Sequence, residues 1–503
     1  MKKNTHFSNN YAKHFVLAII LLAFLLRLPL LNGSFWLDEA AQALESQRPL
    51  SQQFDIIDDF QPPFLHLITA ISIRFDTSEW WLRSWGALIP GLISVSITYA
   101  LGKKFAGVQA GLLSALLLAT SSFHIFYSQE LRPYSLPTAC ALSAAWFFLK
   151  ARQQPLKGNW ALYSVSNLLG LYSSYLYPFF MLAQIIWLKL LTAKNRKLAL
   201  ISWVISVLGF LPWLPTFRDQ LSAGTTVRQL LPGWETVVSI PQLKSLPLVI
   251  GKFIFGVVDL SFSCQFIILT TAIIFSISYL TLYIAKNATK QNRDVLIFIV
   301  SWLIVPLLLS WIVSFWVPVV QPKRVLFLLP ALYLLVGILV TQSFSLTKSI
   351  RRIAFSLALC LLLINGWGTS LYFTTPQLQR ENWRALHRDI TTQFPADQSI
   401  VIFSFPQPFA PWVWYDGNQF PSLSTGSLTT NQIHDLPDLL KPVSEKKYVL
   451  VFDYLRDLTD PDNKIILTLQ SLGYEERFVL DYPQIGFVRV FTRPETVLSF
   501  VVR

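Results

Sequence analysis

The chain has 503 residues, of which 53% are hydrophobic and only 14% charged, and its mean hydropathy is +0.47. Because charged residues make up roughly a quarter of an ordinary soluble protein, this composition excludes a soluble enzyme and predicts a polytopic membrane protein. We attribute the net charge of +13 to lysines and arginines that flank membrane helices, and no interleaved basic and aromatic surface favours nucleic-acid binding.

The charge is divided unevenly along the chain. Residues 1–375 hold 29 Lys and Arg against 13 Asp and Glu, whereas residues 376–503 hold 12 against 15. We therefore predict a transmembrane domain over residues 1–375 and a soluble domain over residues 376–503.

Hydrophobic stretches of the length that a bilayer requires recur throughout the first part of the chain. We predict about eleven transmembrane helices, near residues 14–32, 82–101, 107–125, 133–150, 160–176, 177–193, 199–216, 263–285, 295–316, 324–343 and 352–373. The apolar segment 62–75 is shorter and is bounded by Asp59 and Arg74.

Segment 62–75 decides the orientation of every later helix. If it does not cross the membrane, every short basic cluster falls on the cytoplasmic side, as is typical of membrane proteins. These clusters are Lys103/Lys104, Lys150/Arg152/Lys157, Lys194/Arg196/Lys197, Lys286/Lys290/Arg293 and Lys348/Arg351/Arg352. We therefore predict a juxtamembrane helix in the first external loop, opened by Pro62 and Pro63. The N-terminus is then cytoplasmic, and the C-terminal domain lies outside the cell's inner (plasma) membrane.

After residue 376 the pattern is that of a soluble protein. Strands are expected at 399–405, 448–454, 476–482 and 487–493, and helices at 381–394 and 464–472. Strands that alternate with helices predict a small extracytoplasmic α/β domain.

Asp38 and Glu39 are the first acids after the first predicted span. The neighbouring Phe35 and Trp36 are typical of a headgroup boundary, where a lipid-borne substrate would present its polar head. A partly desolvated carboxylate there could accept a proton from an acceptor hydroxyl or hold a cation. The alternative is a pair of solvated acids that mark a helix end.

Two other external turns carry charge. Glu130, Arg132 and Tyr134 are either interfacial anchors or functional groups, and a guanidinium such as that of Arg132 can bind phosphate with two hydrogen bonds. Lys323 and Arg324 oppose the usual location of basic residues, which favours an anionic partner: the phosphate of a lipid carrier or an ordinary lipid headgroup.

His66, in the predicted juxtamembrane helix, could reach this region, although a structural hydrogen-bonding role is the alternative. Asp38 and Glu130 are the candidates for a divalent metal. No spacing of acids matches a defined cation loop, so the sequence establishes no cofactor.

Four motifs occur in order on the predicted external face. They are Trp36-Leu37-Asp38-Glu39, Gln61-Pro62-Pro63-Phe64-Leu65, Tyr127-Ser128-Gln129-Glu130-Leu131-Arg132-Pro133-Tyr134, and Lys323-Arg324 followed by Leu329-Pro330. In these motifs the chain resembles membrane glycosyltransferases of the GT-C superfold. It is most similar to the bacterial branch related to protein O-mannosyltransferases and to the aminoarabinose transferase of lipid A (families 39 and 83).

The resemblance implies an integral membrane enzyme that moves a monosaccharide from a polyprenyl-phosphate carrier to an acceptor hydroxyl on the external face. The catalytic acid of the family maps onto Asp38, with Glu39 beside it, and the phosphate-binding residues map onto Arg132 and Arg324, with Lys323. Supporting roles are predicted for Glu130, Tyr134, His66 and Gln61. Gln61 is a departure, because the aminoarabinose-transferring relatives have a lysine before the two prolines.

The sugar remains open, and the acceptor could be a glycolipid, a polysaccharide or a protein. The alternative function is a transporter or flippase of lipid-linked sugars. Such proteins usually show internal repeats and place ionisable groups near the middle of the membrane, whereas in this sequence no repeat is visible and no acid falls clearly within a span.

Overall fold

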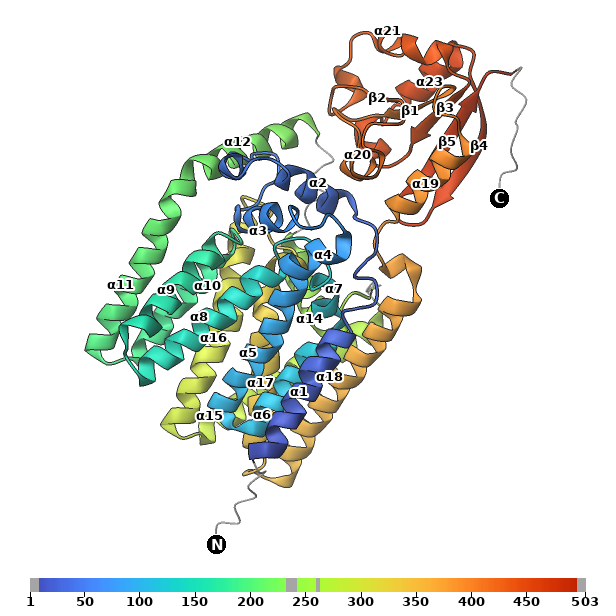
Figure 1. The fold of residues 1–503 in the computed structure, drawn as a ribbon. Helices are drawn as coiled ribbons and strands as arrows, with labels where there is room; N and C mark the ends of the chain where they lie inside the picture. The colour runs from blue at the N-terminus through green and yellow to red at the C-terminus, as the bar shows by residue number, and fades with distance from the viewer. Residues whose placement is uncertain (1–8, 232–241, 259–262, 495–503) are drawn as a thin grey trace.

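The computed structural model describes residues 9–231, 242–258 and 263–494. Helices form an elongated bundle, and a small domain built on a β-sheet lies at one end of it (Figure 1). The helices of the bundle are α1 (Asn9–Leu25), α5 (Ile89–Ala106), α6 (Val108–Thr120), α7 (Ser122–Tyr127), α8 (Ser135–Gln153), α9 (Lys157–Leu171), α10 (Tyr177–Trp187), α11 (Ala193–Phe210), α12 (Leu214–Leu230), α14 (Gln242–Phe255), α15 (Cys264–Asn287), α16 (Lys290–Val313), α17 (Leu329–Ser343) and α18 (Lys348–Thr374).

Each of the eleven apolar stretches expected from the sequence overlaps a helix of this bundle. Within the described residues, six helices are long and apolar enough to cross a membrane, and three further apolar helices are shorter. The chain is therefore a multi-pass membrane protein, while the number of eleven spans stays a prediction. Helix α14 was not expected, because Pro247 and Lys252 interrupt its apolar sequence.

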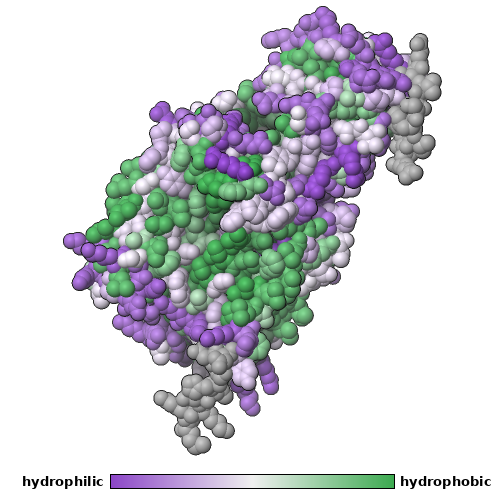
Figure 2. Space-filling model, in the orientation of Figure 1, coloured by the Kyte–Doolittle hydropathy of each residue, from purple (hydrophilic) through white to green (hydrophobic). Residues whose placement is uncertain are grey.

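The surface of the bundle agrees with a lipid environment. Figure 2 shows a broad hydrophobic surface along its side, with hydrophilic surface at its ends and over much of the sheet domain. On α15 the side chains of Ile268, Phe275 and Leu282 are 68%, 70% and 71% exposed. Such exposure of large apolar groups is stable in hydrocarbon and costly in water.

The centre of the bundle is apolar and closely packed. Almost every residue of α17 is buried, as expected for a helix that is hydrophobic on all sides. Helices α5 and α6 approach closely at Gly102 and Gly111, where a Cβ on Gly102 would lie 2.8 Å from the Gly111 Cα. Small residues allow such backbone contact between membrane helices.

The segment between α1 and α5 forms a layer of short helices between the bundle and the sheet domain (Figure 1). These are α2 (Leu37–Ser46), the 3₁₀ helix η1 (Leu50–Phe54), α3 (Phe64–Ser72) and α4 (Glu79–Arg83). The juxtamembrane helix expected near residues 62–75 corresponds to α3, whose nine residues span only about 14 Å and cannot cross a bilayer.

The sheet of the C-terminal domain has the strand order β2-β1-β3-β5-β4. β1 pairs in parallel with β2 and β3, and β5 pairs antiparallel with β3 and β4. The strands are β1 (Ser399–Phe403), β2 (Ser422–Ser424), β3 (Tyr448–Phe452), β4 (Glu475–Tyr482) and β5 (Gly486–Thr492). The main helices are α19 (Trp383–Gln393), α20 (Ala410–Asp416), α21 (Leu436–Leu439) and α23 (Lys464–Ser471).

Alternate residues of each strand supply two apolar cores, one on each face of the sheet. Val401 and Phe403 pack in the core that includes α19 and α20, whereas Ile400 and Ile402 pack in the core that includes α21 and α23. The predicted small C-terminal domain is therefore present. The sequence did not predict β2, which has only three residues.

Candidate active site

Asp38 is the second residue of α2, at the boundary between the bundle and the C-terminal domain. Its side chain is 37% exposed, so the carboxylate is open to water. The Arg132 guanidinium lies beside it, with Nε 3.9 Å from Asp38 Oδ2. Asp38 is therefore an accessible carboxylate with a neighbouring cation.

Glu39, the next residue, is fully buried and pairs with Arg83. Arg83 Nε and Nη2 donate to the two carboxylate oxygens over 2.8 and 2.5 Å, and the Leu131 amide donates to Glu39 Oε1 over 2.6 Å. Burial alone would raise the pKa of Glu39, but the Arg83 guanidinium outweighs it and the pKa is lowered. This geometry gives Glu39 no access to an acceptor.

Arg83 also fixes the loop that connects α1 to α2. Its guanidinium donates to the carbonyls of Leu31, Gly33 and Ser34 over 2.8, 2.6 and 3.0 Å. The sequence analysis did not identify Arg83, because a single arginine at the start of an apolar run is typical of an interfacial anchor.

Arg132 makes a two-pronged ion pair with Asp59. Its Nη1 and Nη2 donate to the Asp59 oxygens over 3.0 and 3.1 Å. His66 Nε2 lies 3.2 Å from the same carboxylate, and Gln61 Nε2 donates to it over 2.5 Å. Gln42 in turn donates to His66 Nδ1 over 2.9 Å. The predicted site residues Arg132, His66 and Gln61 thus meet around Asp59.

Asp59 is charged at neutral pH in this setting. Its burial would raise the pKa, but Arg132 and His66 lower it well below its usual range. Asp59 therefore neutralises part of the charge that the sequence analysis assigned to Arg132 for phosphate binding.

Lys323 and Arg324 lie in the 3₁₀ helix η5 (Pro322–Leu328), directly before α17. The Lys323 ammonium lies 5.5 Å from the Trp36 ring centre and 5.7 Å from the Tyr134 ring centre. Arg324 Nη1 donates to the Val319 carbonyl over 3.3 Å. Among the described residues, neither cation has an acidic side chain within ion-pair distance. Both are therefore available to an anion.

Lys323 contacts the rings of Trp36, two residues before Asp38, and of Tyr134, two residues after Arg132. The charges of Asp38 and Glu130 act on the Lys323 ammonium, and the Asp38 charge acts on Arg324. The predicted catalytic acid is therefore within electrostatic range of Lys323 and Arg324, although they are almost 300 residues apart in the chain.

Glu130 is buried and faces Arg380, whose Nη2 donates to Glu130 Oε2 over 3.2 Å. The guanidinium also lies 4.1 Å from the Phe126 ring centre. Burial raises the pKa of Glu130, although Arg380 and then Lys323 lower it. Arg380 was not identified from the sequence, since it stands alone after the last predicted span.

The candidate metal ligands do not form a metal site. Within residues 9–231, 242–258 and 263–494, no group of three or more His, Cys, Asp or Glu comes together. The charged groups within 4 Å of Asp38 and Glu130 are the arginines Arg132 and Arg380. These residues do not fit a divalent ion.

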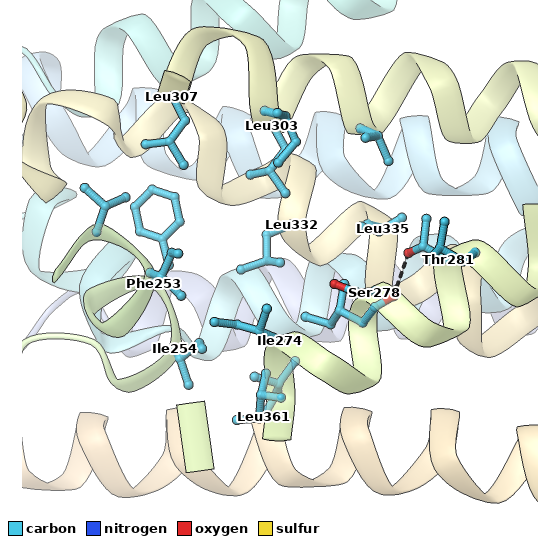
Figure 3. A pocket seen from close by; sticks show the side chains of 17 residues that line it. Phe253, Ile254, Ile274, Ser278, Thr281, Leu303, Leu307, Leu332, Leu335 and Leu361 are labelled. Carbon is cyan, nitrogen blue, oxygen red and sulfur yellow. Dashed lines mark hydrogen bonds between the residues drawn. The ribbon is translucent and has the colours of Figure 1, made fainter. Parts of the chain in front are cut away.

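An apolar cavity of about 390 Å³ lies between α14, α15, α16, α17 and α18. Phe253, Leu307, Leu332 and Leu335 are among the side chains that line it, and Figure 3 shows them around a common space. Leu282, another lining residue, is 71% exposed, so the cavity reaches the lipid-facing surface.

The cavity lies a short helical distance from Lys323 and Arg324. Leu332, which lines it, follows Arg324 by eight residues along η5 and α17, which corresponds to roughly 12–16 Å of helix.

Fold and site together define a polytopic membrane protein with a charged site at the membrane boundary. Residues 60–216 match the model of the dolichyl-phosphate-mannose-protein mannosyltransferase family, a region that includes His66 and Arg132 but not Asp38 or Lys323. By sequence, no curated protein matches the chain.

Two solved structures are similar over nearly the whole chain. ArnT from Cupriavidus metallidurans bound to undecaprenyl phosphate is 12% identical, with a TM-score of 0.60 over 96% of this chain and 98% of ArnT. AglB from Archaeoglobus fulgidus, in complex with an inhibitory peptide and a dolichol-phosphate, is 13% identical, with a TM-score of 0.51 over 97% of this chain and 75% of AglB. The chain has the fold of these two structures.

Proposed function

We propose that the chain is an integral membrane glycosyltransferase that moves a monosaccharide from a polyprenyl-phosphate carrier to an acceptor hydroxyl. One observation carries the proposal. A water-accessible carboxylate, Asp38, lies within electrostatic range of Lys323 and Arg324. Among the described residues these two cations have no acidic side chain within ion-pair distance, and an apolar cavity of the same bundle opens to lipid. The GT-C fold and the lipid phosphate bound by ArnT support the same donor chemistry.

In the proposed reaction the donor phosphate binds at Lys323 and Arg324, with Arg132 close by. Asp38 accepts the proton of the acceptor hydroxyl while its oxygen attacks the anomeric carbon. The bond from that carbon to the phosphate oxygen breaks, and the electron pair leaves with the lipid phosphate. The neighbouring cations stabilise the charge that develops on the phosphate. Attack opposite to the leaving group inverts the anomeric configuration.

In the proposed reaction Glu39 has a structural role and does not contact the substrate. Its buried pair with Arg83 and its contact with the Leu131 amide support a role in holding α2, so that the neighbouring Asp38 faces the acceptor. Glu130 has a similar place, because its pair with Arg380 holds the turn that carries Arg132.

We further propose that the site lies on the extracytoplasmic side of the inner membrane. Lys103 and Lys104 lie in the last turn of α5, and Lys150 lies in the last turn of α8. Helix α8 begins three residues after Arg132, so these lysines are at the end of the bundle remote from the site. The basic end is then cytoplasmic and the C-terminal domain extracytoplasmic.

The direct test is transfer by the purified protein in lipid nanodiscs, with a panel of radiolabelled polyprenyl-phosphate sugars and membrane acceptors. Asp38→Asn removes the base but keeps the size of the side chain, so we expect kcat to fall by about 10²–10⁴-fold. The variant should remain monodisperse with an unchanged thermal midpoint. An Asp38→Asn protein that transfers sugar at the wild-type rate refutes the role of Asp38. If the wild-type protein transfers label from none of the donors in the panel, the proposed activity is refuted.

A further inference from the structure

The C-terminal domain makes several hydrogen bonds to the segment that leads into α2. The Arg384 amide donates to Ser34 Oγ over 3.1 Å, and Arg384 Nη2 donates to the Asn32 carbonyl over 3.1 Å. The Phe35 amide donates to the Tyr415 hydroxyl over 2.8 Å. Asn32, Ser34 and Phe35, in the segment before α2, are thus held by groups of the C-terminal domain.

The first turn of α2 lacks a cap from its own sequence. The N-cap residue, Trp36, provides no side-chain hydrogen bond, and the first amides of a helix need acceptors from elsewhere. Glu381, from the C-terminal domain, accepts hydrogen bonds from Trp383 and Tyr454, and Leu37, the first residue of α2, packs against the apolar cluster that contains these two rings. The Leu37 amide is near enough to the Glu381 carboxylate to lower its pKa.

The position of the Glu381 carboxylate is fixed by these two hydrogen bonds. Tyr454 donates its hydroxyl to Oε1 over 2.9 Å, and Trp383 Nε1 donates to Oε2 over 2.6 Å. Trp383 is fully buried in the core of the domain, so its indole is an immobile donor. A carboxylate held in this way at a helix N-terminus is favoured by the partial positive charge there.

We propose that Glu381 is a positioning residue for Asp38, through which the C-terminal domain holds the first turn of α2 and so sets the direction of the Asp38 carboxylate. The inference rests on the proposed function of Asp38. It gives the C-terminal domain a part in transfer, which neither the fold nor the family match assigns to it.

The electrostatics of the contact agree with this role. The pKa of Glu381 is raised to about 7: burial is the largest cause and the Asp38 charge adds to it, whereas hydrogen bonds from Trp383, Tyr454 and the Leu37 amide lower it. An acidic group kept at such a place, next to another acid, is costly to the fold. The compensating contacts at α2 explain how it is accommodated.

Two substitutions separate the contact with α2 from the contacts inside the domain. In Glu381→Gln the amide can still accept from Trp383 and donate to Tyr454, but it brings no negative charge to the N-terminus of α2. In Glu381→Ala all contacts are lost. Glu475→Ala is the matched control, because Glu475 is an exposed acid of β4 that pairs with Arg477 over 3.5 Å.

The test combines hydrogen exchange with kinetics on the full-length protein in nanodiscs. For Glu381→Ala we expect amide exchange in residues 37–41 to accelerate about tenfold, as for loss of a helix cap. We expect kcat to fall about 10- to 100-fold with donor KM within about twofold, because only the orientation of the base changes. Glu381→Gln should show an intermediate loss of kcat, and Glu475→Ala should match the wild type.

Exchange in β1 and β3 reports whether the domain remains folded. If those strands keep their protection while α2 exchange and kcat stay at wild-type values in Glu381→Ala, the proposal is overturned. A rise in donor KM equal to the loss of kcat also contradicts it, since that result indicates a contact with the donor. If wild-type protein transfers no sugar, the proposed function fails, but exchange at α2 still tests the contact.

Discussion

The buried ion pair of Glu39 and Arg83 allows a quantitative test of whether Glu39 stabilises the fold or acts on a substrate. Each partner is 0% exposed, and Arg83 also donates to three backbone carbonyls. Glu39→Gln leaves the guanidinium buried with only neutral partners, and Arg83→Met leaves a buried carboxylate without its main cation.

We expect each single substitution to lower the free energy of unfolding by about 3–5 kcal/mol, because it leaves an uncompensated buried charge. The double variant leaves neither a buried Glu39 carboxylate nor a buried Arg83 guanidinium without its partner. Its decrease in the free energy of unfolding should therefore be smaller than the sum of the two single decreases, by about 2–3 kcal/mol. The carbonyls of Leu31, Gly33 and Ser34 still lose their donor, so the double variant remains less stable than the wild type.

The assay is a double-mutant cycle, with unfolding followed in mixed micelles and kcat measured at a temperature where all four proteins are folded. If Glu39 holds α2, the double variant regains stability and part of its kcat relative to the singles. Strictly additive losses of stability would refute the structural role. A double variant with restored stability but no transfer would indicate that Glu39 itself acts on a substrate.

The remaining predictions concern the donor site and the junction. Arg324→Ala should raise donor KM about 10- to 100-fold, since a charge-assisted hydrogen bond to phosphate contributes about 1.5–3 kcal/mol, and an unchanged KM argues against phosphate binding there. Leu335→Trp should fill the apolar cavity and raise KM for long-chain donors while short-chain analogues are unaffected; equal effects on both would contradict a lipid-tail site. Burial raises the pKa of Glu381 from its ordinary 4.5 to about 7, so its contribution to stability is present below pH 4.5 and is lost as the pH rises to 7. We expect the free energy of unfolding to fall by up to about 3 kcal/mol over that window, and Glu381→Gln to flatten the dependence measured by pH-dependent unfolding.

The sequence predicted the helices far better than the partners of the charged residues. Long apolar runs have one favourable environment, so each predicted stretch became a helix. Ion pairs between distant segments leave no local pattern. Arg132 was expected to be free for phosphate, but Asp59, 73 residues away, pairs with it. Arg83 was missed for the same reason, since its partner is 44 residues away.

The external motifs were informative because they are local and share one face. The order of Asp38, Arg132 and Arg324 along the chain, combined with the positions of basic loops, predicted that they share one face, and in the structure Arg132 Nε lies 3.9 Å from Asp38 Oδ2. The sequence could not show which acids are accessible. Asp38 and Glu39 are adjacent, yet one is open to water and the other is buried, because successive residues of a helix point about 100° apart.

The location of the apolar cavity has a consequence for the order of binding. It opens toward lipid between helices of the bundle, whereas Asp38 is open at the aqueous end below the C-terminal domain. For the proposed transferase the two substrates then arrive through separate entrances and are present at the same time. Initial-rate plots at several acceptor concentrations should consist of intersecting lines, as for a sequential mechanism, and parallel lines would instead indicate a covalent ping-pong intermediate.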